Sequence, residues 1–191
     1  GHRLSPIQAA RTLHLMGPIM VTVPQPDDKP DTKVLQPGWQ ASHVLRALAV
    51  FCNSDAPEPG PEHFPYVDGI DGRLPHGPRG RQNNRQLADA LTPALHTAWA
   101  DVQHPLGRLR FTHDVYLKLW ALGHAAGRWP IPAEFVLFDE AQDASPVMLA
   151  VLADAATRDG QQVAYVGDSN QQIYEWRGAV DALDRLPVEL A

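Results

Sequence analysis

Apolar residues recur at helical spacing along several stretches of the first two thirds of the chain. The spacing predicts three amphipathic helices, at 39–53, 85–102 and 112–123. Thr112 is a plausible N-cap for the third of them. Segments rich in Pro and Gly separate these stretches and are typical of breaks; they lie at 24–37, 57–80 and 130–132. We therefore expect the first half of the chain to be mostly helical.

After Pro132 the pattern changes to two short apolar runs, at 134–138 and 162–166, with a helical stretch at 146–157 between them. This order predicts a βαβ unit with a right-handed crossover and two parallel strands. Acidic residues follow both runs: Asp139 and Glu140 after the first, and Asp168 after the second. Ligands of such sheets bind beyond the carboxyl ends of the strands, so we expect these carboxylates to meet in one crevice.

Composition places the chain among globular proteins. Its 191 residues, 44% of them apolar, are enough for one ordinary domain or two small ones. No run of eighteen apolar residues and no secretory pattern at Gly1-His2-Arg3 is present, so neither membrane insertion nor export is expected. The single cysteine, Cys52, excludes an intrachain disulfide and a Cys/His metal cluster, and its apolar neighbours favour a packing role.

Charge is distributed unevenly along the sequence. The net charge is -6, and residues 135–191 carry 3 basic against 10 acidic side chains, so the acidity belongs to this last part. The stretch from 73 to 85 is locally basic and has no acid within it; its arginines are Arg73, Arg79, Arg81 and Arg85. This stretch is either a phosphate contact or a solvated loop whose charge keeps it soluble.

Two longer strings are more specific than the strand ends alone. Residues 136–143 read VLFDEAQD, and residues 166–179 read VGDSNQQIYEWRGA. The first resembles helicase motif II, the Walker B box, and the second resembles motif III of the UvrD/Rep group of superfamily one DNA helicases. Residues 112–120, THDVYLKLW, resemble the helix that precedes motif II in F-box DNA helicases and their bacterial relatives.

The resemblance implies an α/β fold: a partial RecA-like (P-loop NTPase) parallel sheet with helices at 111–191, preceded by a mostly helical 1B-type insertion at 1–110. It also implies a Mg·ATP site, in which Asp139 would hold Mg²⁺ and Glu140 would contact the nucleotide and activate the attacking water. Gln171 would bind near the γ-phosphate and sense its loss. Each residue type suits its role, because Mg²⁺ prefers oxygen ligands and an amide can both donate and accept a hydrogen bond.

The same resemblance implies single-stranded DNA and DNA junctions as partners, together with the remainder of the helicase motor. Tyr174 and Trp176 would lie along the DNA track, where Trp176 would stack on a base. Arg177 would join that aromatic face to the nucleotide. The location expected for such a protein is the bacterial cytoplasm near the nucleoid, or the nucleus of a eukaryote.

No G-x-x-x-x-G-K-[ST] loop occurs in the sequence, so the β and γ phosphates of ATP have no cradle here. We therefore expect the chain to be an internal fragment of a 3′ to 5′ helicase and to be inactive alone. Its sheet would be incomplete, with exposed apolar surface and a tendency to associate. Two alternatives stay open: a degenerate DNA-binding module without ATP turnover, and a metal-dependent nuclease that uses Asp139, Glu140, Asp143 and Asp168.

Overall fold

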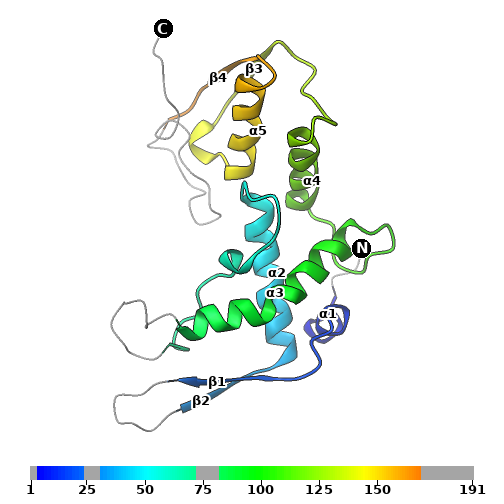
Figure 1. Ribbon diagram of the computed structural model, residues 1–191, viewed down its shortest axis with the longest axis vertical. Coiled ribbons are helices and arrows are strands. Elements are labelled where there is room, and N and C mark those ends of the chain that lie inside the picture. Colours follow the sequence, from blue (N-terminus) through cyan, green and yellow to red (C-terminus); the bar gives the residue numbers. More distant parts are fainter. Residues whose placement is uncertain (1–3, 24–30, 72–81, 169–191) are drawn as a thin grey trace. The chain divides into compact units, whose positions relative to one another are not determined.

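The computed structural model describes residues 4–23, 31–71 and 82–168, and its backbone forms two compact units (Figure 1). The first unit comprises Gly1–Ala49 and Glu58–Phe111, and the second comprises Val50–Pro57 and Thr112–Ala191. In the described residues no helix is both long and apolar enough to cross a membrane.

The first unit combines helices with a small antiparallel sheet. Its elements are α1 (Pro6–Thr12), β1 (Ile19–Val23), β2 (Asp31–Leu35), most of α2 (Pro37–Asn53), the 3-10 turn η1 (Pro61–His63) and α3 (Gln82–Gln103). The helices predicted at 39–53 and 85–102 are confirmed with slightly wider bounds. On α3 the predicted apolar face is buried, including Leu87, Leu91 and Leu95, and the helix packs against η1 and β1.

The described first half is mostly helical, as predicted, but it also contains a small sheet that was not predicted. β1 pairs antiparallel with β2, from Ile19 opposite Leu35 to Val23 opposite Asp31. Val21 and Val23 are buried while their neighbours along β1 are less so, which is the period of two expected of a half-buried strand. The Pro-rich stretch at 24–37 was predicted to be a break between elements, but β2 lies inside it.

Helix α1 was also not predicted, although its start carries a clear sequence signal. Ser5 accepts a hydrogen bond from the backbone N–H of Gln8, and the Gln8 side chain accepts one from the N–H of Ser5. Pro6 occupies the first turn, where its lack of an N–H costs nothing. This capping box explains why so short a segment becomes helical.

His43 is buried on α2 between two aromatic rings, and we expect this to make the first unit sensitive to acid. Its ring stacks on Trp39 at 5.0 Å and lies 5.4 Å from the ring of Phe64. Burial, with a smaller contribution from Arg46, lowers the pKa of His43 to about 4. Between pH 6.5 and 4 the unfolded chain therefore binds the proton and the folded chain does not, so stability present above this window should fall by about 3 kcal/mol across it.

The measurement is the free energy of unfolding as a function of pH, for the wild-type chain and for His43→Leu. The variant should lose the part of the pH dependence that lies between pH 6.5 and 4. His96→Leu is the matched control, because His96 is exposed on α3. Equal pH dependence in wild type and His43→Leu would contradict the prediction.

The second unit contains the predicted βαβ arrangement. Its elements, after the end of α2, are α4 (His113–Ala125), β3 (Phe135–Phe138), the 3-10 turn η2 (Ala141–Asp143), α5 (Pro146–Thr157) and β4 (Gln162–Tyr165). β3 pairs parallel with β4, with Phe135 opposite Gln162 and Phe138 opposite Tyr165. The predicted α/β character is thereby confirmed. Thr112 occupies the N-cap position of α4, but its side chain makes no capping hydrogen bond.

One side of this parallel sheet has large apolar side chains exposed to solvent. Phe135 and Leu137 of β3 are 56% and 61% exposed, and Val166, just after β4, is 50% exposed. α5 packs against β4 and α4, and the core includes Val147 and Val151 of α5. The expected exposed apolar surface is therefore present, whereas the expected tendency to associate stays a prediction.

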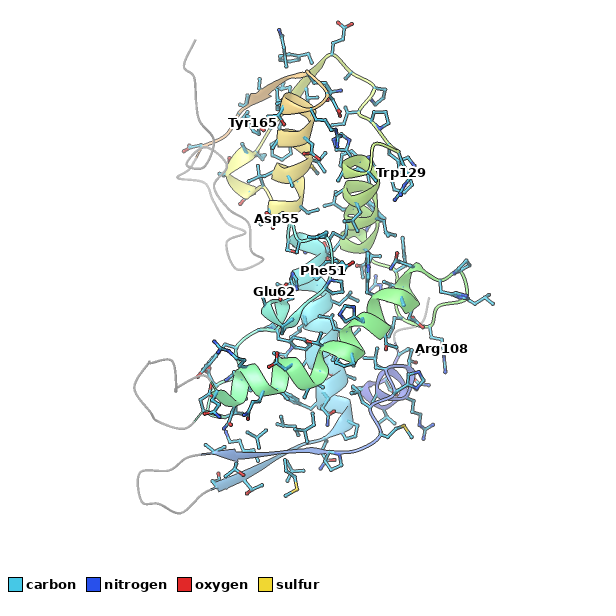
Figure 2. The ribbon with its side chains drawn as sticks, viewed as in Figure 1. Phe51, Asp55, Glu62, Arg108, Trp129 and Tyr165 are labelled. Atoms are coloured by element: carbon cyan, nitrogen blue, oxygen red, sulfur yellow. The ribbon has the colours of Figure 1, made fainter. Side chains whose placement is uncertain are left out.

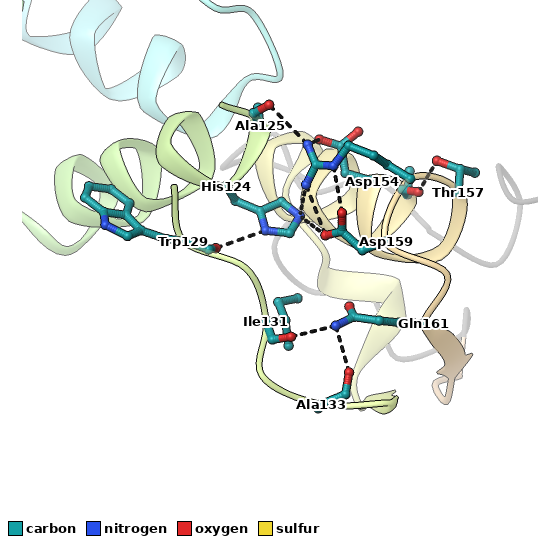
Figure 3. Close-up of polar contacts among 11 residues, drawn as sticks. His124, Ala125, Trp129, Ile131, Ala133, Asp154, Thr157, Asp159 and Gln161 are labelled. Atoms are coloured by element: carbon teal, nitrogen blue, oxygen red, sulfur yellow. Dashed lines mark hydrogen bonds and ion pairs between the residues drawn. The ribbon is translucent and has the colours of Figure 1, made fainter. Parts of the chain in front are cut away.

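Polar contacts fix the segment that leads into β3 (Figure 3). The Gln161 side-chain amide donates to the carbonyls of Ile131 and Ala133, at 2.6 and 2.7 Å. The Arg158 guanidinium donates to the carbonyl of Ala125 at 3.1 Å and pairs with Asp159 at 2.8 Å. These contacts connect the end of α4 and the residues before β3 to the turn between α5 and β4. They therefore hold the starts of β3 and β4 in place.

Candidate functional site

The candidate site lies at the carboxyl ends of β3 and β4. The two strands are parallel and in register, so the residues that follow them leave the same edge of the sheet. Beyond the strands, the Val166 N–H donates to the carbonyl of Phe138, and the Ala141 N–H donates to the carbonyl of Val166, each at 2.9 Å. The pairing thus continues past both strand ends and holds the two acidic segments, 139–140 and 168, at one edge.

Asp139 is the first residue after β3, and its carboxylate is exposed. Its Oδ1 accepts a hydrogen bond from the N–H of Glu140 at 2.9 Å, which orients the carboxyl group. An exposed carboxylate at a strand end is a suitable ligand for Mg²⁺, which is usually bound by one or two carboxylates together with substrate phosphates and water. Asp139 therefore fits the predicted metal ligand.

Glu140 has a left-handed backbone conformation, with φ 56° and ψ 42°. This conformation is uncommon for a residue other than Gly, Asn or Asp, and it turns the chain sharply from β3 into η2. The Oε2 atom of Glu140 accepts a hydrogen bond from the Nε2 of Gln142 at 2.6 Å. Backbone strain of this kind clusters at functional sites, which agrees with a role for Glu140 in chemistry.

Gln142 is the residue at this edge to which sequence reasoning assigned no role. Its side chain is buried, with 1% of the residue exposed, and it makes two hydrogen bonds. While Nε2 donates to Glu140, Oε1 accepts the backbone N–H of Asp168 at 3.0 Å. Gln142 therefore connects the acid after β3 with the segment after β4. The sequence signal that could have indicated this role is a polar amide between two small apolar residues, Ala141 and Ala144, which are both buried in the structure.

The remaining predicted site residues lie outside the described part of the chain. They are Gln171, Tyr174, Trp176 and Arg177. Their roles at the γ-phosphate and on DNA stay predictions.

The shared edge is also where the sequence of the chain is most similar to known proteins. The UvrD/REP helicase N-terminal domain matches residues 111–183. This UvrD/REP segment contains α4, both strands of the parallel sheet and the candidate site. The resemblance predicted from the two motif strings is thereby confirmed for this segment.

Similar curated proteins are named as helicases. F-box DNA helicase 1 of Gallus gallus is 35% identical over 82 residues, which cover 42% of this chain and 7% of that protein. A probable DNA helicase II homolog of Mycoplasma genitalium is 31% identical over 75 residues, covering 37% of this chain and 10% of that protein. A homolog of the same name from Mycoplasma pneumoniae is 38% identical over 60 residues, covering 31% and 8%.

The chain thus matches a tenth or less of the length of these curated relatives. No solved structure matches it.

A buried lysine near the start of the UvrD/REP segment anchors α4 to the end of α2. Only 1% of Lys118 is exposed, and its Nζ donates to the carbonyls of Ser54 and Ala56, at 2.7 and 2.6 Å. The same Nζ lies 4.4 Å from the centre of the Phe51 ring, in the last turn of α2 (Figure 2). Burial lowers the pKa of Lys118 to about 8, against the opposing effects of Cys52 and Asp55. The ammonium therefore remains mainly charged at neutral pH.

The structure does not bring together the acids that the nuclease alternative requires. In the described part of the chain, which includes Asp139, Glu140, Asp143 and Asp168, no group of three or more His, Cys, Asp or Glu side chains is placed to hold a metal ion. A carboxylate-metal nuclease needs such a cluster, whereas a Mg²⁺ ion shared with nucleotide phosphates does not.

The basic stretch at 73–85 is described only from residue 82 onward, so Arg73, Arg79 and Arg81 lie outside the described residues. Arg85 is exposed on α3 and lines an open cavity of about 460 Å³ beside the aromatic residue Tyr66. The cavity is also lined by the acids Glu62 and Asp89, so it carries both signs of charge.

Proposed function

We propose that this chain supplies the Mg·ATP carboxylates and part of the DNA track of an ATP-dependent DNA helicase and translocase. The observation that carries the proposal is the position of Asp139 and Glu140 at the carboxyl end of a parallel strand, within a segment that matches the UvrD/REP helicase N-terminal domain. This is the edge where parallel sheets bind ligands.

The proposed reaction is hydrolysis of the γ-phosphoryl group of ATP. Water attacks the γ-phosphorus, the bond from that phosphorus to the β–γ bridging oxygen breaks, and ADP and phosphate are formed. Glu140 accepts the proton that the attacking water loses, and its hydrogen bond from Gln142 holds the accepting carboxylate in place. Asp139 would hold Mg²⁺, which supplies positive charge next to the phosphate oxygens.

The fold we propose for the second unit is the second half of a RecA-like domain, and for the first unit a 1B-type insertion. The exposed apolar side chains of β3 support the first part of this proposal, because a RecA-like sheet is covered on both faces. The curated relatives are each about ten or more times longer than the matched segment. The phosphate-binding loop and the second motor domain would belong to other parts of such a longer protein.

Coupling to DNA would involve the residues that follow Asp168 in the sequence. Tyr174 and Trp176 would contact single-stranded DNA, with Trp176 stacked on a base, and Arg177 would link them to the nucleotide. Gln171 would detect the γ-phosphate. Movement on single-stranded DNA would run from 3′ to 5′, as the resemblance implies.

The test uses a longer protein that contains these residues together with a phosphate-binding loop. It should hydrolyse ATP faster when single-stranded DNA is added, and should displace a strand from a duplex with a 3′ tail but not from one with a 5′ tail. The 191-residue chain alone should show neither activity. If the longer protein binds DNA but does not hydrolyse ATP, the degenerate DNA-binding module replaces the proposal.

A further inference from the structure

We propose that Gln142 is a positioning residue that locks the Glu140 carboxylate to the backbone of Asp168, so that the general base and the segment after β4 move as one. This inference rests on the proposed function of Glu140. It assigns to a residue without an expected role the task of joining the two motif strings.

Gln142 is suited to this task because its amide has one donor end and one acceptor end. The donor end points to the carboxylate of Glu140 at 2.6 Å, and the acceptor end receives the N–H of Asp168 at 3.0 Å. A carboxylate can only accept and a backbone N–H can only donate, so a neutral amide satisfies both partners simultaneously. Only 1% of Gln142 is exposed, so its amide depends on these two part-buried bonds for its partners.

Close packing around Gln142 keeps the amide in one position. A Cβ atom built on Gly167 would clash with the Oε1 of Gln142 and would lie 2.9 Å from the backbone nitrogen of Ala141. Only glycine therefore lets the segment after β4 approach this near. Glu140, with its left-handed backbone, places its Oε2 2.6 Å from the Nε2 of Gln142. The two hydrogen bonds thus form on one buried side chain.

This linkage through Gln142 would change the position of Glu140 when the γ-phosphate leaves. Gln171, the proposed phosphate sensor, follows Asp168 by three positions in the sequence. A displacement of Asp168 would pull on the Oε1 of Gln142 and so move the carboxylate of Glu140. A single side chain would thus return the base to its active position only when the segment after β4 is in place.

The first experiment measures hydrogen exchange of the Asp168 amide by NMR in the 191-residue chain. Gln142→Met keeps the size of the side chain but removes both hydrogen bonds, so the Asp168 amide should exchange about 10-fold faster or more. Gln142→Glu keeps an acceptor for the Asp168 N–H, so the amide should stay protected. Unchanged exchange in Gln142→Met would overturn the inference, because the acceptor would then be dispensable.

The second experiment measures ATP hydrolysis by the longer protein. Gln142→Glu removes the donor to Glu140 and sets a like charge beside it, and Gln142→Met removes the donor alone. Both variants should lower kcat by about 10-fold to 100-fold while KM for ATP changes less than about 3-fold. A wild-type kcat in Gln142→Glu would overturn the inference.

Gln161→Met is the matched control, because it also deletes two side-chain hydrogen bonds in the second unit, to the carbonyls of Ile131 and Ala133. Its kcat should equal that of wild type, and an equal fall in kcat would overturn the inference by showing a general loss of structure. If wild-type protein hydrolyses no ATP, the proposed function fails, and the exchange of the Asp168 amide still decides whether Gln142 joins the two segments.

Discussion

A Glu140→Gln variant of the longer protein is expected to lose DNA-stimulated ATP hydrolysis by about 100-fold or more, because the amide cannot accept the proton of the attacking water. The fold should survive the change. The new side-chain oxygen can still accept the hydrogen bond from Gln142, and Glu140 is exposed. Affinity for single-stranded DNA should stay within about 2-fold of wild type, since the proposed DNA contacts do not include this carboxylate. The measurements are steady-state ATP hydrolysis with and without DNA, and DNA binding by fluorescence anisotropy.

Glu134→Gln supplies the matched control, because Glu134 is an exposed acid immediately before β3, at the opposite end of the same strand. It makes the same change of charge and should leave hydrolysis at the wild-type rate. Unchanged turnover in Glu140→Gln would rule out Glu140 as the base. A loss of DNA binding that parallels the loss of hydrolysis would show that the substitution acts on the fold instead.

Local pattern was sufficient to predict the elements that have strong periodicity. The strand predicted at 134–138 is β3, and the helix predicted at 146–157 is α5 with the same bounds. Both are defined by signals within a few residues: Pro146 starts the helix, and an unbroken apolar run marks the strand. Their parallel pairing also followed from the order strand, helix, strand. Features of this kind depend little on distant parts of the chain.

The antiparallel pair of β1 and β2 shows where local pattern was misleading. The prolines at 24–37 favoured the prediction of a break, and the two segments at 19–23 and 31–35 were too short to stand out as strands. β1 depends on β2 for its hydrogen bonds, so neither strand is specified by its own residues alone. Pairing of this kind is decided by tertiary contacts, which single-sequence propensity does not contain.

The acids of the candidate site were predictable, but the side chains that support them were not. Asp139 and Glu140 are specified by the strand that they follow, whereas the hydrogen bond of Gln142 to Asp168 joins residues 26 positions apart. Lys118 is a similar case, since it bonds to Ser54, 64 positions away. Lysine is almost never fully buried, so sequence gives no reason to expect it inside. The reason lies in the carbonyls beyond the end of α2, which need a donor.

A Lys118→Met variant is expected to destabilise the second unit by about 2 to 4 kcal/mol, the cost of removing a buried charged donor from the two half-buried carbonyls that it satisfies. Methionine can fill most of the volume and keep contact with the Phe51 ring, but it provides no donor for Ser54 and Ala56. Because these carbonyls lie just past α2, the loss also removes a favourable cation at a helix C-terminus. Hydrogen exchange of amides in α4 and α5 of the 191-residue chain measures the effect within this unit.

Lys33→Met is the matched control for this change, because Lys33 is a half-buried residue of β2 in the first unit. Its effect on the second unit should be below about 0.5 kcal/mol, as for most substitutions away from buried polar networks. Amides of α4 should therefore exchange much faster in Lys118→Met than in Lys33→Met. If Lys118→Met changes hydrogen exchange in α4 no more than Lys33→Met does, the Lys118 ammonium does not stabilise this unit. Packing of the side chain on Phe51, rather than the two hydrogen bonds to carbonyls, would then hold α4 to the end of α2.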